Sequence, residues 1–392
     1  MSLLTFNEKF LEKKGAMLTA KEIAGQPQLW RYVVNCFYHA ENKINNFLQA
    51  AYSEADNILL TGAGTSAFIG LSLCGAFFRH TNIITKPIAT TDIVSHPHDF
   101  FNEQHTPLII SFARSGNSPE SVAALELADK LSKKCFHLII TCDENGELAK
   151  YNSRNPTCVF VLPGEANDKS LAMTGSYSSM LLTGLMVAYI QQPEKIQQQL
   201  DLLTQAAANI LSHSSLLKFI AEKNFKRAMF LGCGSLFGTA MEAALKLQEL
   251  TDGRIICKTD TYLGLRHGPK AVIDGKTLVV YFFSNDNYAN RYEQDLVQAM
   301  KTGNNAMFQL GVSEKYEAAD DLDEQINFGI NGENIDEDFL PVCSIVAGQL
   351  LGFYKSLQLG LSPDEPSVNG SISRVVQGVH IYPLEKQVMN YE

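Results

Sequence analysis

A repeat with a period of 170 residues constrains this chain more than any other feature of its sequence. Three short apolar runs of the first half recur in the second half at this one spacing. The runs of the first half are Ile58–Thr65, Leu108–Phe112 and Leu138–Cys142, and their counterparts are Ala228–Ser235, Leu278–Phe282 and Phe308–Val312. Short apolar runs separated by helical stretches are typical of a parallel sheet with crossover helices. The sequence therefore predicts two homologous α/β domains.

The segments around the repeats complete the predicted organisation. Apolar residues between Trp30 and Tyr38 recur at helical spacing, which predicts one apolar helix face. The stretch Gln191–Leu211 has the composition of a connecting helix. We expect an N-terminal helical segment over residues 1–45, a first domain over 46–205, a second over 206–362 and a C-terminal tail over 363–392 that closes the site.

Composition excludes several classes of function. The formal net charge of −10 argues against nucleic acid, whose phosphates require a basic face. The eight cysteines form no CxxC pair, so we interpret them as buried thiols in a reducing compartment. We find no signal peptide and no stretch of about 18 apolar residues, so we expect a cytoplasmic protein without a membrane span.

Two turns that follow strand-like runs carry glycine and hydroxyl groups. Gly62–Ala67 fits a relaxed dinucleotide fingerprint, a tight turn without a ligand, or a turn whose N–H groups face an anion. A dinucleotide site requires an acidic residue about 20 positions further on. The nearest candidate, Asp92, lies further away than this, which argues against a dinucleotide site. In Ser115–Glu120, Ser118 and Pro119 fit the start of a helix, where Ser118 either only caps the helix or helps to hold a phosphate. Both turns would lie at the carboxyl ends of the strands, where α/β sheets bind ligands.

The second half contributes charged candidates. Glu242, Lys246 and Glu249 are spaced to share one face of a helix. A solvated ion pair explains this face as well as a catalytic site does. His267 precedes Gly268 and Pro269 on a predicted turn, where a structural role competes with a catalytic one. His96 and His98 form a possible metal pair, although a solvated loop explains them better, and we predict no metal and no other cofactor.

The order of these motifs makes the resemblance specific. Gly-x-Gly-Thr-Ser, then Ser-Gly-x-Ser, then a lysine–glutamate helix and His-Gly-Pro resemble the sugar isomerase (SIS) domain family over residues 45–375. The chain is similar to the isomerase half of glucosamine-6-phosphate synthase. Its Thr261–Lys270 and Arg374–Gly378 strings are closest to the AgaS branch. The resemblance implies an α/β fold of two tandem doubly wound, flavodoxin-like three-layer sandwich domains with parallel sheets.

The resemblance also implies roles for individual residues. Glu249 would move a proton between C1 and C2 of an open-chain sugar, Lys246 would lie near that sugar, and His267 would open the ring from a neighbouring subunit. The substrate and its phosphate would be bound by Gly64, Thr65, Ser66, Arg114, Ser115, Gly116, Asn117, Ser118 and Arg374. Ala113 and Arg114 replace the serine and glutamine of the synthase's phosphate loop, so Arg114 would either contact the phosphate or face solvent. Arg374 would stand roughly where the synthase's C-terminal lysine closes the site.

These residues predict an enzyme that acts on a phosphorylated sugar or amino sugar. Proton transfer between C1 and C2 needs a carboxylate base and a group that opens the ring, and the phosphate serves to fix the sugar. The AgaS resemblance implies that galactosamine 6-phosphate is converted to tagatose 6-phosphate and ammonia. A plain tagatose-6-phosphate ketose/aldose isomerase and a non-catalytic sugar-phosphate regulator remain alternatives. Shared active sites imply a homodimer or a higher homo-oligomer, and we expect no nucleic-acid or membrane partner.

Overall fold

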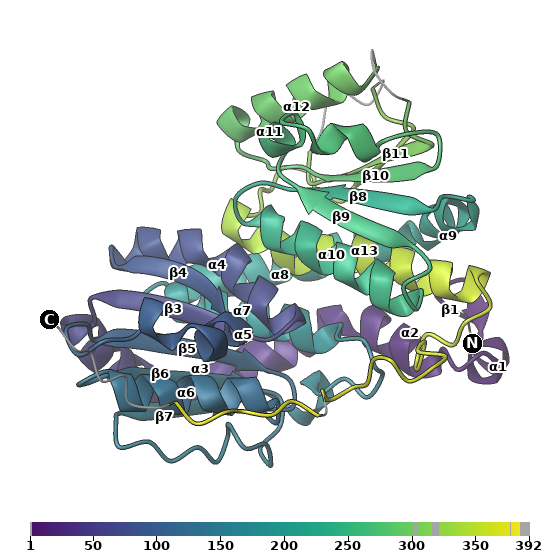
Figure 1. Ribbon diagram of the computed structural model, residues 1–392. Helices are drawn as coiled ribbons and strands as arrows, with labels where there is room; N and C mark the ends of the chain where they lie inside the picture. Colours follow the sequence, from purple (N-terminus) through teal and green to yellow (C-terminus); the bar gives the residue numbers. More distant parts are fainter. Residues whose placement is uncertain (1, 302–304, 316–320, 377, 385–392) are drawn as a thin grey trace, which may run out of the picture.

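Two parallel sheets of five strands form the centre of the molecule (Figure 1). The computed structural model describes residues 2–301, 305–315, 321–376 and 378–384. The strands of the first sheet are β3 (Asn57–Gly62), β4 (Ile84–Ala89), β5 (Pro107–Ala113), β6 (Phe136–Thr141) and β7 (Thr157–Val161). The strands of the second sheet are β8 (Arg227–Leu231), β9 (Ile256–Asp260), β10 (Thr277–Phe282), β11 (Phe308–Ser313) and β12 (Glu324–Asn327).

The two sheets have the same topology, which confirms the predicted repeat. The first sheet has the order β4-β3-β5-β6-β7 and the second, taken in the same direction, β9-β8-β10-β11-β12. This order is that of flavodoxin-like folds. The register repeats as well, because Ile58 pairs with Leu108 and Ala228 pairs with Leu278. The fold class is therefore the predicted one.

Helices cover both faces of each sheet and give the three-layer arrangement (Figure 1). Those of the first half are α3 (Gln26–Glu54), α4 (Thr65–Thr81), α5 (Thr90–Ser95), η1 (Pro97–Asp99), α6 (Pro119–Leu131), η2 (Gly164–Ala166) and α7 (Gly175–Ala188). Those of the second half are α8 (Pro193–Ser212), α9 (Ser214–Glu222), α10 (Leu236–Leu250), α11 (Tyr262–Leu265), η3 (Pro269–Val272), α12 (Asn287–Lys301), η5 (Glu337–Phe339) and α13 (Leu340–Gln358). The N-terminus adds β1 (Ser2–Leu3), β2 (Phe6–Asn7), α1 (Glu8–Lys13) and α2 (Met17–Ala24).

The connecting and N-terminal helices follow the sequence pattern closely. Helix α8 covers the expected connecting helix, and Trp30, Val33, Val34 and Phe37 of α3 are buried, as the helical spacing predicts. Helix α3 also runs without a break through residues 45 and 46. The expected limits of the domains stay a prediction.

One apolar cluster joins the two halves. It contains residues of the inner faces of both sheets together with α3, α4, α7, α10 and α13, while two smaller clusters lie under α11–α12 and under α5–α6. Residues 337–358 are long and apolar enough to cross a membrane, but 94% of the apolar window is buried inside the protein. A helix enclosed by other helices in this way is the core helix of a folded domain.

Helices α4 and α10 pack unusually close where the two halves meet. A Cβ atom on Gly238 of α10 would lie 2.2 Å from Ser72 Oγ and 2.6 Å from the Phe68 carbonyl oxygen of α4. Side chains of α10 extend across this contact toward the first domain. The distance between α4 and α10 therefore determines where the ends of these side chains lie.

We predict that Gly238→Ala destabilises the protein by about 1–3 kcal/mol, because the added methyl group overpacks the contact between α4 and α10. The better helix propensity of alanine opposes this loss only in part. Urea unfolding measures the effect. Gly275→Ala is the matched control, since a Cβ atom at Gly275 meets nothing within 4 Å. Equal stability of the two variants would contradict the prediction.

Candidate active site between the two domains

The two hydroxyl-bearing turns of the first repeat lie side by side at the carboxyl edge of their sheet. Gly64 has a φ of +55° and directs the chain from β3 into α4, whose first residues Thr65 and Ser66 are buried. The second turn leads from β5 into α6, where Ser118 occupies the N-cap position but makes no capping hydrogen bond. The Ser118 hydroxyl therefore remains available to bind a ligand.

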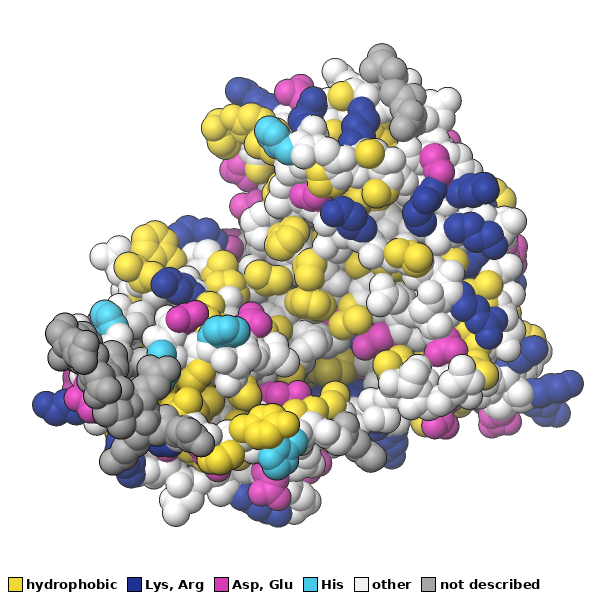
Figure 2. Space-filling model, in the orientation of Figure 1, with side chains coloured by type: hydrophobic (Ala, Val, Ile, Leu, Met, Phe, Trp, Pro, Cys, Tyr) yellow, Lys and Arg dark blue, Asp and Glu magenta, His cyan; other side chains and the backbone are white. Residues whose placement is uncertain are grey.

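A cavity of about 480 Å³ opens between these turns and helix α10. Figure 2 shows that the surface is hollowed between the two lobes, with hydrophobic side chains scattered along the hollow. The predicted residues that line the cavity are Gly64, Thr65, Ser66, Arg114, Ser115, Gly116, Ser118, Lys246, Glu249 and Arg374. The structure thus brings together residues that the sequence separates by up to 310 positions, from Gly64 to Arg374.

Lys246 links the two domains at the floor of the cavity. Its side chain is almost completely buried, and Nζ lies 3.0 Å from Thr65 Oγ1, 2.5 Å from Glu249 Oε2 and 3.3 Å from Glu242 Oε1. Burial alone would lower the pKa of Lys246, but the neighbouring carboxylates outweigh burial and raise it. Lys246 therefore stays charged and holds Glu249 by a hydrogen bond, and the solvated-face interpretation of this helix is wrong.

Glu242 belongs to the same group, although sequence reasoning gave it no role. It is fully buried; Oε1 lies 3.4 Å from Thr65 Oγ1, and Oε2 has no hydrogen-bond partner among the described residues. Burial raises the pKa of Glu242 to about 8, although Lys246 acts in the opposite direction. The i, i+4 spacing of Glu242 and Lys246 indicated that the two side chains pair. The sequence did not show that this face of the helix is buried.

Two arginines that line the cavity, Arg114 and Arg374, connect segments of its wall by hydrogen bonds to backbone carbonyl groups. Arg114 is buried, and its guanidinium donates to the carbonyl oxygens of Ser170 (3.3 Å), Leu171 (3.0 Å) and Arg374 (2.6 Å). Burial and the nearby charge of Arg374 lower the pKa of Arg114. Arg114 therefore does not face solvent, which was one of its two predicted positions.

Arg374 fixes the C-terminal tail over the same cavity. Its Nε donates to the Asp168 carbonyl oxygen at 2.9 Å, and Nη2 donates to that oxygen and to Asn167 Oδ1, both at 2.6 Å. Residues 370–374 line the cavity beside it. In Figure 1 the yellow tail runs along the first domain.

Two predicted site residues lie outside the lining. Asn117 is exposed; its N–H lies 3.3 Å from Ser115 Oγ, and its Oδ1 accepts a hydrogen bond from the Glu147 N–H at 3.0 Å. His267 is exposed on the turn after α11. His96 and His98 are exposed as well, as expected of a solvated loop.

Comparisons with known proteins find relatives along almost the whole chain. The model of the SIS domain matches residues 51–190. D-galactosamine-6-phosphate deaminase AgaS of Shewanella sp. (strain ANA-3) is 39% identical, and the match covers 98% of this chain and 97% of that protein. A solved structure from Clostridium novyi NT, provisionally named a tagatose-6-phosphate ketose/aldose isomerase, has a TM-score of 0.94 and 40% identity and covers 98% of this chain and 100% of its own.

The resemblance to the synthase appears in the fold. The C-terminal domain of glucosamine-fructose-6-phosphate aminotransferase from Francisella tularensis has a TM-score of 0.70 at 19% identity, with 88% of this chain and 96% of that chain covered.

We predict that Glu242 makes the stability depend on pH. A carboxyl group whose pKa rises on folding stabilises the folded state fully below its unfolded pKa, here 4.5, and loses this contribution as the pH rises through about 8. The free energy of unfolding of the wild type should therefore fall, relative to that of Glu242→Gln, on the order of a few kcal/mol between pH 5 and pH 8.5. Urea unfolding across this range measures the difference. Glu12→Gln, at an exposed position, is the control, and curves of wild type and Glu242→Gln that stay parallel would refute the prediction.

Proposed function

Because this chain belongs to the SIS domain family, we propose that it is a sugar-phosphate isomerase and deaminase that converts galactosamine 6-phosphate and water to tagatose 6-phosphate and ammonia. One observation carries the proposal: Lys246 and Glu249 of the second domain line the same cavity as Thr65, Ser115 and Ser118 of the first. The names of the relatives supply the substrate.

The phosphate fits the hydroxyl-lined end of the cavity. Ser115 and Ser118 lie at the start of α6, and Thr65 and Ser66 are the first residues of α4. Free N–H groups and the helix dipole make such helix starts suitable for anions. Binding there would place C1 and C2 of the open-chain sugar toward Glu249. The phosphate itself takes no part in the reaction and serves to fix the sugar.

The carboxylate of Glu249 is the proposed base. It takes the proton from C2 of the open-chain aldehyde while O1 gains a proton, giving an enolamine; it then returns a proton to C1 while the amine nitrogen loses one. The product is a ketimine at C2, and addition of water to the C=N bond releases ammonia and leaves the ketone. Lys246 is hydrogen-bonded to Glu249 at 2.5 Å. In the proposed reaction it supplies a fixed positive charge near O1 of the sugar, where negative charge develops when C2 loses its proton.

His267 is proposed to open the sugar ring in a neighbouring subunit. A histidine suits this step because it accepts and donates protons near neutral pH. Its exposed position outside the cavity supports a role in another chain's site, so we propose a homodimer or higher homo-oligomer with shared sites. We further propose that the enzyme is cytoplasmic, since all eight cysteines are free thiols.

A plain tagatose-6-phosphate ketose/aldose isomerase is the second candidate. The name of the Clostridium novyi structure favours it. With an oxygen in place of the amine at C2, the same proton transfer gives an enediol and then a ketose, without release of ammonia.

We expect the purified protein to release ammonia and tagatose 6-phosphate in equal amounts from galactosamine 6-phosphate. A glutamate dehydrogenase assay measures ammonia, and a ketose assay measures the sugar. Glucosamine 6-phosphate, the C4 epimer, is the matched substrate and should react more slowly. Ketose formation from an amine-free aldose phosphate, with no ammonia from either amino sugar, would establish the plain isomerase instead.

We expect Glu249→Gln to lower kcat by about 10²–10⁴-fold and to leave sugar-phosphate binding nearly unchanged, because the amide keeps the shape but cannot take a proton. Steady-state kinetics and calorimetric binding measure the two effects.

Mixed oligomers test the shared site. Glu249→Gln and His267→Ala chains, each inactive alone, should regain about a quarter of the wild-type activity when coexpressed as dimers, because one site in four then has both groups intact. No recovery, or an active monomer, would rule out sharing.

A further inference from the structure

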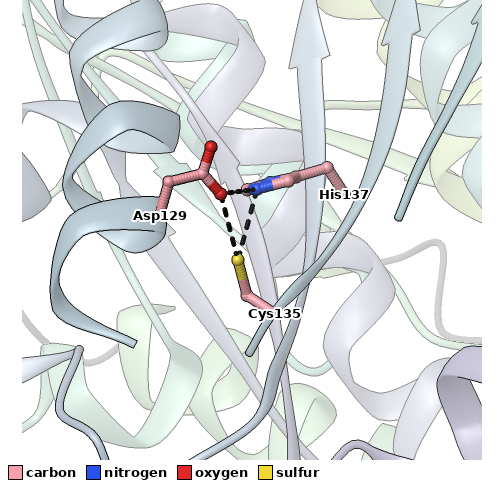
Figure 3. Close-up of side chains that lie close together, drawn as sticks. All are labelled: Asp129, Cys135 and His137. Atoms are coloured by element: carbon pink, nitrogen blue, oxygen red, sulfur yellow. Dashed lines mark hydrogen bonds and ion pairs between the residues drawn. The ribbon is translucent and has the colours of Figure 1, made fainter. Parts of the chain in front are cut away.

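Asp129, Cys135 and His137 form a side-chain cluster in the first domain (Figure 3). Asp129 lies in the last turn of α6, Cys135 just before β6 and His137 within β6. They are the one group of three or more potential metal ligands found in the described part of the chain, and none of them lines the cavity. Cys135 and His137 are completely buried.

The contacts of this cluster fit an anion better than a cation. Five side chains approach the carboxylate of Asp129 within hydrogen-bond distance. At Oδ1 these are His137 Nε2 (2.8 Å), Asn155 Nδ2 (2.9 Å) and Cys135 Sγ (3.3 Å), and at Oδ2 they are Ser153 Oγ (2.6 Å) and Tyr151 OH (2.8 Å). Burial alone would raise the pKa of Asp129, but these hydrogen bonds outweigh burial and hold the pKa well below its usual range. An ionised carboxylate only accepts, so Nε2 of His137 carries a proton and is not free to bind a metal.

The carboxylate holds the far end of the loop that follows β6. We call residues 143–156 the backing loop. Tyr151, Ser153 and Asn155 belong to it, and Arg154 Nη2 also donates to the Asp129 carbonyl oxygen at 2.6 Å. One residue of α6 thus anchors the backing loop by four of its hydrogen bonds.

The near end of the backing loop packs against the turn Ser115–Ser118. The Leu148 N–H donates to the Gly116 carbonyl oxygen at 3.0 Å, and the Glu147 N–H donates to Asn117 Oδ1 at 3.0 Å. Gly146 lies so close that a Cβ atom there would come within 2.2 Å of the Ser115 carbonyl oxygen. The backing loop therefore fixes the backbone of the turn through residues that do not line the cavity.

A short path joins the two ends. The Tyr151 N–H donates to the Leu148 carbonyl oxygen at 3.2 Å. Tyr151 is hydrogen-bonded to Asp129, and Leu148 is hydrogen-bonded to Gly116, so this bond connects the two ends of the backing loop. We propose that Asp129 is a positioning residue for the phosphate-binding turn Ser115–Ser118 and acts on it through the backing loop. This inference rests on the proposed function, because it takes that turn as the phosphate site.

Asp129→Asn tests the proposal, because the amide places a donor against the hydroxyl and N–H groups that surround the carboxylate. We expect KM for the sugar phosphate and the competitive inhibition constant of inorganic phosphate to rise together by about tenfold, with less than about a threefold fall in kcat. Asp338→Asn is the matched control, since Asp338 is also a carboxylate held by several hydrogen bonds, here with Arg79 and Tyr189 and away from the turn. The control should lose thermal stability without a change in either constant. Unchanged constants in Asp129→Asn would overturn the proposal.

Two further variants keep the outcome decisive. If Asp129→Asn does not fold, Tyr151→Phe removes a single hydrogen bond, and a smaller rise in both constants supports the proposal while no rise refutes it. Ser115→Ala separates the two proposals: if it leaves both constants unchanged, the phosphate assignment fails, and if it raises them while Asp129→Asn does not, only the positioning role fails. A Zn²⁺-dependent rise in the melting temperature of the wild type that Cys135→Ser abolishes would make the cluster a metal site and overturn the inference.

Discussion

The buried ammonium group of Lys246 is the interaction on which the rest of the site depends. An ion without water is stable only when charged and polar partners surround it. Lys246 obtains them from both domains, with the Glu249 carboxylate and the Glu242 carboxyl group on its own helix and the Thr65 hydroxyl at the start of α4. The hydrogen bond to Thr65 therefore fixes the position of α10 against the first domain. It also sets the separation between the Glu249 carboxylate and the hydroxyl-lined turns.

The sequence predicted the parts of this arrangement that depend on periodicity. The 170-residue spacing of Ile58 and Ala228 predicted two similar sheets, and the strand order and register agree with it. The hydroxyl-bearing turns were predicted because glycine and hydroxyl residues directly follow buried strands. Helical spacing also showed that Glu242, Lys246 and Glu249 share a face.

The remaining features depend on packing between distant segments. Periodicity indicates which residues share a face but not what covers it, so the burial of Glu242 against the first domain was not predicted. The position of Arg114 was equally hidden, because its partners Ser170, Leu171 and Arg374 lie on irregular segments far along the chain. The support of the turn at Ser115 by Gly146 depends on a close approach of two loops, which no local pattern encodes.

The arginines of the cavity wall have a consequence for how an anion reaches the site. The hydrogen-bond partners of Arg114 and Arg374 are neutral carbonyl and amide oxygens, and the Asp168 and Glu249 carboxylates act on Arg114 only through their charge. A protein with a net charge of −10 thus places two guanidinium groups in the wall of one cavity. Positive groups that line a cavity attract a dianion before it makes contact. Dissolved salt screens that attraction. A higher ionic strength should therefore lower the association rate of the ligand more than it raises the dissociation rate.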